Sequence, residues 1–382
     1  MKDGGAIRKI VIVGNGLRAW LPAAYLSARL PKTVYSISVV EYGKKYDIGS
    51  LVARPMVRRM HQLLQISEQE LAQSANAKLV LGVSVPHSSG QTITMPYGQY
   101  GVDRAGAEFH QYWRRAFGEG QAKELSEYNL AYKLDQAGVY ARSAPKGLPA
   151  IDYGYSLSQA GYCELLKAHA LGAGVSCHEG AAGSDGLSCG AGHVTRIPTS
   201  DGNAECDMVI DANMCASTST ADKSRLSGWH GNILQLPNQS PIPGIELQLL
   251  IMAMERLIGL WPDRQFLACE TGEYNRLDRA VRDRVADMEL LFSRGVEEIK
   301  QSAALARKIK VFSRRGRIPI EDHEVFSKSE WLAALIGSGI MPVQHDRLAD
   351  RIPIGDLSRW LRSIDLAITQ TVERAKEGRR VR

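Results

Sequence analysis

The sequence predicts a mixed α/β fold that opens with a parallel βαβ unit, and three features near its start predict it. An apolar strand, Ile10–Val13, runs directly into a glycine-rich turn over Gly14–Ala19. Apolar residues then recur at helical spacing as far as Ala28. A second apolar strand, Ser36–Val40, ends at the acid Glu41. This order of strand, turn, helix, strand and acid is the one that a dinucleotide-binding unit requires.

Each residue type in this turn has a physical role toward a bound dinucleotide. Gly14 permits the tight turn, Gly16 lets the backbone approach a pyrophosphate, and the small Ala19 lets helix and strand pack closely. The amides that open the helix face the phosphates, and Glu41 is placed to accept hydrogen bonds from a ribose. An acid rather than an arginine after the second strand argues against NADP and suits FAD or NAD. The predicted cofactor-binding residues of this unit are Gly14, Asn15, Gly16, Leu17, Arg18, Ala19 and Glu41.

The composition is that of a globular protein of 382 residues, with 44% hydrophobic and 23% charged residues. This length suits one large domain or two fused domains. The net charge of +6 is modest, and the basic runs Arg314–Arg317 and Arg379–Arg382 lack interleaved aromatic residues. Such runs are typical of solvated faces or tails, so no nucleic-acid partner is expected.

Membrane and metal sites are not expected either. No apolar run reaches the roughly 18 residues that a membrane span needs, and no signal-peptide pattern precedes Ile7. The six cysteines form no C-x-x-C pair, which argues against a zinc site or thioredoxin-like chemistry. We therefore expect a cytoplasmic protein with reduced, mostly buried thiols, no metal and no membrane partner.

Beyond the first unit, periodicity and turn residues predict a mixed region followed by a helical one. Asp211 ends a short buried strand, as expected for a parallel strand that returns to the nucleotide-binding sheet. The aromatic and basic helix Phe109–Arg115 places its rings either in the core or against a ligand, and core packing is the favoured interpretation. The other predicted elements are helices at Val57–Leu64 and Gly161–Ala173, a helix that opens at Ser67 with Glu70 completing a capping box, strands at Lys78–Val85, Cys206–Ala212 and Gly231–Leu236, a β-meander within Gly180–Ile197, a loop at Ser217–Ser227, and helices after Ile245 with a break at Gly316–Pro319.

Several separated segments carry the motifs of one family. Gly14–Trp20 is similar to G-G-G-T-A-G-W, and Val209–Ala212 is similar to V-I-D-A-T-G. The remaining similarities are Tyr97–Gly101 to H-P-F-G-x-x-G, Phe109–Trp113 to F-H-x-Y-W, Gly244–Ile245 to P-L-E-S-T-G-I, Glu255–Asp263 to E-R-L-L-x-L-F-P-D, Phe312–Arg317 to F-x-x-R-G-R, and Glu330–Gly339 to S-W-L-A-V-L-L-G-Q-G. These segments are collinear over nearly the whole chain, which therefore resembles the flavin-dependent tryptophan halogenases.

The resemblance implies an FAD-dependent oxidoreductase that works with oxygen. In that family, a separate flavin reductase supplies reduced FAD, and a halide bound beside the flavin is oxidised to hypohalous acid. A lysine then positions this species against an electron-rich ring. The resemblance thus implies FAD as cofactor, a flavin reductase as partner, and an aromatic or indolic substrate, free or carrier-bound. It adds Asp211, Gly244 and Ile245 to the cofactor-binding residues and leaves homodimerisation open.

The implied architecture is an FAD-binding, Rossmann-like three-layer α/β domain with a β-rich insertion and a helical C-terminal region. We place the FAD-binding domain at residues 1–263, with a shortened substrate-side insertion at about 76–200. The mainly helical C-terminal region then covers residues 264–382.

Four departures from the family pattern bear on the chemistry. The W-x-W-x-I-P signature, which keeps substrate away from the flavin, is absent, and a single loop joins Asp211 to Gly231 where the family has a long excursion. Val80 stands where the family has its lysine. Lys78, two positions earlier, faces the same side of a strand, so it is either the replacement catalytic residue or a surface lysine at a strand start.

The fourth departure concerns the halide. The family holds its halide with backbone N–H groups of an S-T-G turn, whereas this chain has Ser240-Pro-Ile-Pro243-Gly244, and proline has no N–H. We therefore expect chloride to bind weakly, because an anion nest works by converging donors. The G-E-A-T strap between flavin and tunnel is also unrecognisable near Ser50–Ala53.

Three functions are compatible with these residues. The first is a flavin-dependent halogenase or monooxygenase, and the second is a catalytically retired homologue that binds flavin or another protein. The third, an NAD-linked dehydrogenase, is less supported because no His/Asp or Tyr/Lys hydride-transfer pair stands out near the glycine turn.

Overall fold

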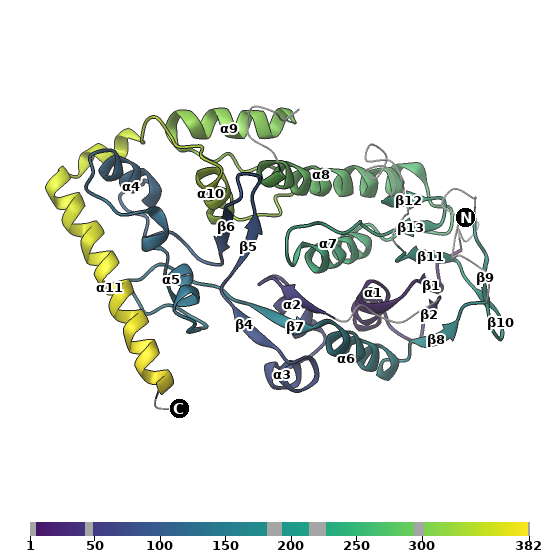
Figure 1. Ribbon diagram of the computed structural model, residues 1–382. Coiled ribbons are helices and arrows are strands. Elements are labelled where there is room, and N and C mark those ends of the chain that lie inside the picture. The colour runs from purple at the N-terminus through teal and green to yellow at the C-terminus, as the bar shows by residue number, and fades with distance from the viewer. Residues whose placement is uncertain (1–4, 43–48, 182–192, 214–226, 294–301, 381–382) are drawn as a thin grey trace. The chain divides into compact units, whose positions relative to one another are not determined.

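The computed structural model describes five stretches of the chain, which are residues 5–42, 49–181, 193–213, 227–293 and 302–380 (Figure 1). They form two compact units, which we describe separately. Unit 1 comprises Met1–Lys78 and Tyr155–Arg282, and unit 2 comprises Leu79–Gly154 and Asp283–Arg382. Mixed α/β structure with a parallel sheet and a helical C-terminal region confirms the predicted fold class.

The bounds of these units differ from the sequence-based division at residue 263 with an insertion at about 76–200. The chain re-enters unit 1 at Tyr155 because β7 (Gly154–Ser158) pairs antiparallel with β3 (Ser50–Ala53). The second boundary falls inside one continuous helix, α8 (Ala268–Ser293). The assignment of cofactor and substrate roles to the sequence-based segments stays a prediction.

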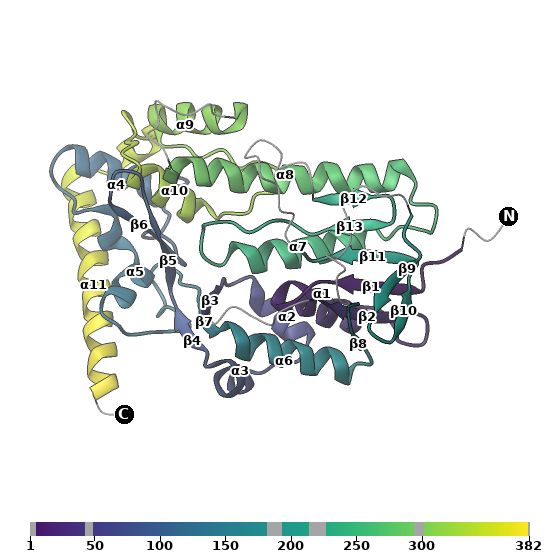
Figure 2. The same ribbon diagram turned by 45° about the vertical axis from the view of Figure 1, so that its right-hand side comes forward.

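Unit 1 is built on a six-stranded sheet in the order β12-β13-β11-β1-β2-β8, which Figure 2 shows as stacked ribbons. All neighbours are parallel except β12 and β13, which are antiparallel. The strand order reverses at β1, so the crevice beyond the carboxyl ends of β1 and β11 is where such a sheet binds its ligand. The strands are β1 (Lys9–Val13), β2 (Ser36–Glu41), β8 (Ser176–Glu179), β11 (Met208–Asp211), β12 (Gly228–His230) and β13 (Ile233–Gln235).

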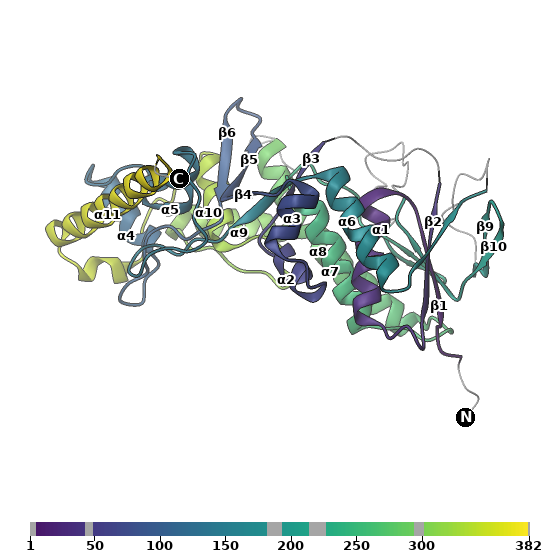
Figure 3. The same ribbon diagram turned by 90° about the horizontal axis from the view of Figure 1, so that it is seen from below.

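The two faces of this sheet are covered by different structures because side chains alternate along each strand. Val11 and Val13 of β1 pack with Ile197 and Cys206, which belong to or adjoin a hairpin made of β9 (Arg196–Thr199) and β10 (Gly202–Glu205). The alternate residues of β1, Ile10 and Ile12, are equally buried on the other face. Figure 3 shows the hairpin on one side of the sheet and α1 (Gly16–Arg29) and α6 (Gln159–Gly172) on the other, which gives the predicted three layers.

The remaining helices of unit 1 follow the predicted positions, with one correction to a cap. Ser67 accepts a hydrogen bond from the Glu70 backbone at 3.1 Å, as the capping box requires. The Glu70 carboxylate, however, pairs with His169 at 2.9 Å across to α6. The helices are α2 (Val57–Leu63), α3 (Glu68–Ala75) and α7 (Ile245–Gly259).

Unit 2 contains a hairpin and the helical end of the chain. The strand predicted at Lys78–Val85 is two strands, because the chain breaks at Leu81 and then pairs Gly82 with Pro96. A helical break at Gly316 was predicted, and α9 ends there in a left-handed residue. The elements are β4 (Lys78–Val80), β5 (Gly82–Pro86), β6 (Thr92–Pro96), α4 (Phe109–Gly118), η1 (Leu125–Tyr128), α5 (Leu130–Gln136), α9 (Ala303–Arg315), α10 (Lys328–Gly337), η2 (Arg347–Arg351) and α11 (Ile354–Arg380).

The aromatic helix α4 packs in the core of unit 2, which was the favoured interpretation. Phe109, Tyr112 and Trp113 are each at most 1% exposed. The Tyr112 hydroxyl donates to the Arg104 carbonyl at 2.7 Å, and Trp113 Nε1 donates to the Lys123 carbonyl at 2.8 Å. Their polar atoms are thus satisfied by the protein itself.

Some predicted features fall wholly or partly outside the described residues. The β-meander within Gly180–Ile197 and the loop at Ser217–Ser227 do so, as does the end of the basic run Arg379–Arg382. Of the four described cysteines, Cys163 and Cys206 are buried, so the prediction of mostly buried thiols holds for half of them. Among the described helices, none has the length and apolar character needed to span a membrane.

Candidate functional site

The glycine-rich turn connects β1 to α1 at the carboxyl edge of the six-stranded sheet. Gly14 has a φ of +143°, and a Cβ atom built on it would lie 2.9 Å from Cβ of Ala212 and 3.3 Å from the backbone nitrogen of Asn213. Gly14 also donates its N–H to the Val40 carbonyl at 3.1 Å. Only glycine therefore lets this turn approach the segment that follows β11.

The start of α1 is open to an anion. Its N-cap residue, Asn15, makes no side-chain cap hydrogen bond, and the first turn contains no acidic residue. Gly16, the first helical residue, has a φ of 62°, which side chains rarely adopt. The amides and dipole of a helix N-terminus favour a phosphate at such a place. Leu17 and Ala19 are buried, so these two residues shape the turn through their backbone and packing.

Asn15 carries a buried oxygen that needs a donor. Its Nδ2 donates to the Tyr42 carbonyl, whereas its Oδ1 has no hydrogen-bond partner within the described part of the chain. A buried acceptor without a donor costs about 1–3 kcal/mol. A ligand hydroxyl or amide in this turn would satisfy Oδ1, so the residues present fit a polar cofactor.

Glu41 lies at the carboxyl end of β2, as predicted, and its carboxylate is held by the protein. Oε1 accepts from Trp20 Nε1 and Oε2 from Lys167 Nζ, each at 3.0 Å. Burial raises the pKa of Glu41, but the hydrogen bonds from Trp20 and Lys167 outweigh it and leave that pKa lowered. Glu41 is therefore ionised and fixed. Because a carboxylate has about four acceptor sites, it can still accept a ribose hydroxyl.

Arg18, in the first turn of α1, joins three segments of the same sheet edge. Its Nε donates to the Ala212 carbonyl and its Nη2 to the Pro237 carbonyl, both at 2.8 Å. Its Nη1 pairs with the Glu246 carboxylate at 3.1 Å. The guanidinium is thus engaged by protein acceptors, and the backbone amide is what Arg18 can offer a cofactor.

Asp211 shapes the loop that faces Gly14. The residue is 2% exposed, and its carboxylate accepts the Asn213 N–H at 3.0 Å, which closes a tight turn after β11. Its carbonyl accepts from Gln235 Nε2 at 3.2 Å. Burial raises the pKa of Asp211, although hydrogen bonds from Asn213 oppose this effect. Asp211 therefore acts through the position of the backbone around Ala212.

The Gly244 turn lies against β3 (Ser50–Ala53), near which the strap motif of the family could not be recognised in the sequence. Gly244 has a φ of +78°, and a Cβ atom on it would lie 2.7 Å from Cγ of Arg54 and 2.9 Å from the carbonyl oxygen of Val52. β3 and the start of α7 therefore touch in unit 1. The Ser50–Ala53 segment therefore lies beside the Gly244 turn, which its sequence did not indicate.

The amides of this turn are mostly used within it. Ile245 donates to the Ile242 carbonyl at 3.3 Å, and Ile242 donates to Ser240 Oγ at 3.2 Å. Pro243 has no N–H to give. Within the described residues, Gly244 is left as the amide of the turn that makes no hydrogen bond. One amide is a poor nest for an anion.

Lys78 lies at the start of β4, where it was predicted, and its side chain is exposed. Its ammonium group makes no hydrogen bond or ion pair with any residue that the structure describes. These surroundings match a surface lysine at a strand start.

Two partners of Glu41 were missed from the sequence. The sequence showed Trp20 only as the last residue of the first motif, and nothing linked it to Glu41. In the structure its buried indole donates a hydrogen bond to the Glu41 carboxylate. Lys167, on α6, pairs with Glu41 and lies 4.6 Å from the centre of the Trp20 ring. No local signal marks Lys167, because it is 126 positions from Glu41 along the chain.

In unit 2, three of the quoted motifs contact one another. Gly101 has a φ of +55° and lies so close to the Phe109 ring that no Cβ atom would fit. His110 Nε2 lies 2.6 Å from the Gly316 carbonyl. These contacts link Tyr97–Gly101 to the aromatic helix, and the aromatic helix to Phe312–Arg317. The motifs are therefore held together by packing.

Comparison with known proteins decides the family. The sequence profile described as tryptophan halogenase matches residues 9–234 and 224–354. The chain belongs to the tryptophan halogenase family. No protein with a curated description matches the sequence. The family membership predicted from collinear motifs is thus confirmed.

Solved structures of halogenases share the fold of this family member. A flavin-dependent halogenase from Brevundimonas sp. BAL3 has a TM-score of 0.83 at 21% identity, covering 97% of both chains. One from Xanthomonas campestris has a TM-score of 0.83 at 20% identity, covering 98% of both. A tryptophan 6-halogenase from Streptomyces toxytricini has a TM-score of 0.76 at 15% identity, covering 96% of this chain and 97% of that one. At these identities the likeness establishes the fold.

Proposed function

We propose that this protein is an FAD-dependent enzyme that uses reduced FAD and oxygen to halogenate, or otherwise oxidise, an aromatic or indolic substrate. The observation that carries the proposal is the glycine turn at the sheet switch point. Gly14 is pressed against Ala212, and the buried Asn15 Oδ1 lacks a donor. Family membership supports a flavin over a nicotinamide cofactor.

Different residues at this edge of the sheet bind different parts of FAD. The amides of Gly16 and Leu17 at the start of α1 receive the pyrophosphate, and Glu41 accepts the ribose hydroxyls. Lys167 and Trp20 hold Glu41 in one orientation, while Arg18 fixes the surrounding loops. Bound in reduced form, FAD supplies the electrons that activate oxygen. A separate flavin reductase supplies that reduced form.

The halide step is where this chain differs most from its family. A chloride beside the Gly244 turn would lose part of its hydration shell and gain one backbone N–H, that of Gly244, as a donor. A single donor is too few for tight binding. We therefore expect halide capture to be weak and direct oxidation of the substrate to compete with it. Lys78 is exposed, and we propose that it is not the essential transferring residue.

The proposal is tested by supplying the purified protein with enzymatically reduced FAD, oxygen, an indole panel and either bromide or no halide. Halogenated or hydroxylated products above the protein-free level, lost in Gly16→Val, support it. Saturable FAD binding without any product would instead identify a retired flavin-binding homologue. Absence of FAD binding, together with tight NAD binding, would contradict the flavin assignment altogether.

A further inference from the structure

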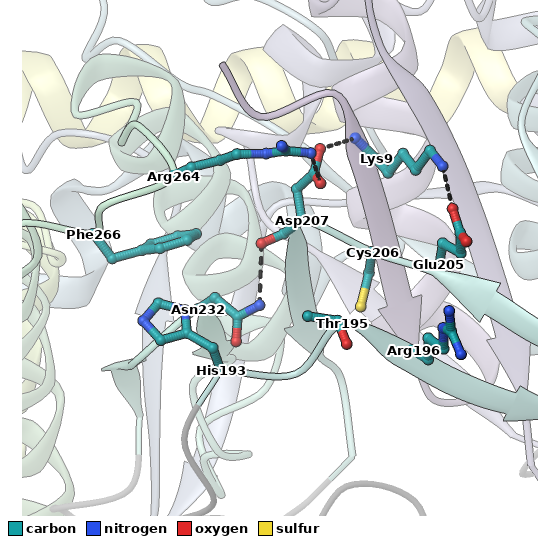
Figure 4. Close-up of a pocket in the computed structure, with 10 residues that line it drawn as sticks. All are labelled: Lys9, His193, Thr195, Arg196, Glu205, Cys206, Asp207, Asn232, Arg264 and Phe266. Atoms are coloured by element: carbon teal, nitrogen blue, oxygen red, sulfur yellow. Dashed lines mark hydrogen bonds and ion pairs between the residues drawn. The ribbon is translucent and has the colours of Figure 1, made fainter. Parts of the chain in front are cut away.

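A second pocket lies at the opposite edge of the six-stranded sheet from the glycine turn. It has a volume of about 510 Å³ and is bordered by Lys9, which begins β1, and Asp207, which precedes β11 (Figure 4). The glycine turn follows Val13 at the other end of β1, which is about 13 Å away along the strand. The pocket is therefore separate from the proposed FAD site, and its size is that of a small-molecule site.

The cations that line this pocket, Lys9, Arg196 and Arg264, outnumber its two acids, Glu205 and Asp207. Glu205 pairs with Lys9. Asp207 accepts the backbone N–H groups of Arg8 and Lys9 at 2.7 and 2.9 Å and also pairs with Arg264. Both acids are thus neutralised by the protein. Arg196, exposed on β9, stands opposite Glu205 in the β9–β10 hairpin and acts electrostatically on that carboxylate, but its side chain makes no hydrogen bond or close ion pair with any described residue. An anion entering the pocket would meet this guanidinium.

The other end of the pocket is aromatic. The rings of His193 and Phe266 lie 5.7 Å apart, and Phe266 contacts Trp229 at 5.4 Å. Phe266 has a φ of 47°, which is an outlier for a bulky side chain, and such strain collects at binding sites. Figure 4 shows His193 and Phe266 on one side of the pocket and Arg196 on the other.

The space between these ends is polar and chemically inert. Thr195 and Cys206 lie there in Figure 4. Burial raises the pKa of the Cys206 thiol to about 12, so this sulfur is protonated and not a nucleophile. The pocket therefore has the features of a binding site and lacks those of a second catalytic site.

We propose that this pocket binds an aromatic anion of about the size of a nucleoside monophosphate. Its ring stacks on the exposed His193 beside Phe266, and its phosphate or carboxylate pairs with Arg196. The aromatic end and Arg196, which forms no close ion pair, lie on opposite sides of one cavity, which is the arrangement that such a ligand needs. The inference is independent of FAD, because it concerns the other end of the sheet.

The test is calorimetric titration of FAD-saturated protein with AMP, adenosine, inorganic phosphate and indole-3-acetate. Saturation with FAD prevents AMP from reporting on the cofactor site. We expect saturable binding of AMP or indole-3-acetate, whichever anion the pocket prefers. Adenosine and phosphate should bind at least about tenfold more weakly, because each makes half of the contacts.

Variants then assign the binding to the pocket. Arg196→Ala should weaken the anionic ligand at least about tenfold and leave adenosine unchanged, while Arg196→Lys recovers part of the loss. His193→Ala should weaken every aromatic ligand. Arg29→Ala removes the same charge from an exposed position on α1 and should change nothing. Gly16→Val should retain AMP binding, which separates this inference from the FAD proposal.

Two results would overturn the inference. One is the lack of saturable binding of both AMP and indole-3-acetate to the FAD-saturated protein. The other is binding whose affinity is the same in Arg196→Ala as in the unaltered protein.

Discussion

Lys167 holds the carboxylate of Glu41 in a 3.0 Å ion pair, and the two side chains are only 16% and 9% exposed. The same ammonium group lies over the ring of Trp20, which donates its indole N–H to the other oxygen of Glu41. The acid that we propose as the ribose acceptor is therefore held in one orientation by the protein itself. Preorganisation of this kind lowers the cost of binding.

Replacement of this acid tests its two roles together. Glu41→Gln should weaken FAD binding at least about tenfold and destabilise the fold by about 1–3 kcal/mol, because Lys167 loses a partly buried partner. Flavin-fluorescence titration and urea unfolding measure the two effects. The matched control is Glu205→Gln, which breaks a pair with Lys9 that is half exposed on both sides and should leave both quantities unchanged. Unaltered FAD affinity in Glu41→Gln would remove this acid from the site.

Two substitutions at Gly16 test whether the glycine turn binds FAD, and together they separate the effect of backbone strain from that of steric exclusion. Gly16→Val should abolish FAD binding, because the side chain blocks the approach of the pyrophosphate. Gly16→Asn suits the left-handed conformation better, since asparagine tolerates it, and should weaken binding while the fold is retained.

The control for this pair is Gly120→Val, at a φ of +68° with open space around the Cβ position. It imposes similar strain in unit 2, so it should cost stability and leave FAD affinity intact. Circular dichroism reports the fold and titration reports the affinity. Full FAD affinity in Gly16→Val would place the cofactor elsewhere.

The stability of unit 1 should depend on the protonation of a buried histidine. Burial lowers the pKa of His61 from 6.5 to about 4, and its Nε2 lies 2.8 Å from the Tyr162 hydroxyl. Between these two pKa values the unfolded chain binds a proton that the folded chain does not bind. The free energy of unfolding is therefore highest above about pH 6.5 and decreases as the pH falls toward 4. At about 1.4 kcal/mol per pKa unit, the loss is on the order of 3 kcal/mol.

Urea unfolding at pH 7 and pH 5 measures this dependence. His61→Gln keeps a hydrogen-bonding group toward Tyr162 without titrating, so it should reduce the difference between the two pH values. His178→Gln changes a more exposed histidine of the same unit and should leave the difference as it is. An equal pH difference in the unaltered protein and in His61→Gln would rule out this histidine as the cause.

The parts of the fold that the sequence could predict are those set by local periodicity and glycine chemistry. The β1-α1-β2 unit and the returning strand at Asp211 are of this kind. The contacts of Arg18 are of another kind, because its acceptors lie 194 to 228 positions away. Which loop a guanidinium reaches depends on the path of the whole chain, and no spacing encodes it.

The same reasoning explains the strands that were missed or divided. β12 is three residues long, Gly228–His230, which is too short for alternation to be recognised. The break at Leu81 arises because Gly82 must lie against the backbone of β6, where a Cβ atom would be 2.8 Å from the Met95 carbonyl. Both depend on a partner strand that only the folded chain supplies.

Lys78 should not be essential in the way that the family lysine is. Its side chain is exposed, and it stands two positions before the residue, Val80, that replaces the family lysine. Lys78→Ala should therefore keep FAD affinity and at least about half of the product formation, since exposed substitutions are usually mild. Lys32→Ala, at another exposed lysine of unit 1, is the control. Complete loss of product with FAD oxidation intact would make Lys78 the transferring residue.

Halide affinity should increase when a single backbone N–H is added beside Gly244. In the present turn, Pro243 has no N–H, and the Ile245 amide donates to the Ile242 carbonyl at 3.3 Å. Pro243→Thr adds one N–H beside the Gly244 amide, and one such bond to an anion is worth about 1.5–3 kcal/mol. Bromide affinity should therefore rise about tenfold or more, with a larger share of halogenated product.

Pro241→Thr is the control for this substitution, because it relieves the same proline constraint two residues earlier in the turn. It should leave bromide affinity unchanged, because the N–H that it adds lies three residues before Gly244, and this separates a donor beside Gly244 from greater backbone freedom. Crystals soaked in bromide give the direct measurement, since anomalous scattering locates the ion. Bromide within hydrogen-bond reach of the Gly244 and Ile245 amides in the unaltered protein would contradict the prediction. In that case the turn would gather enough donors despite Pro243, and halide capture would proceed as in the rest of the family.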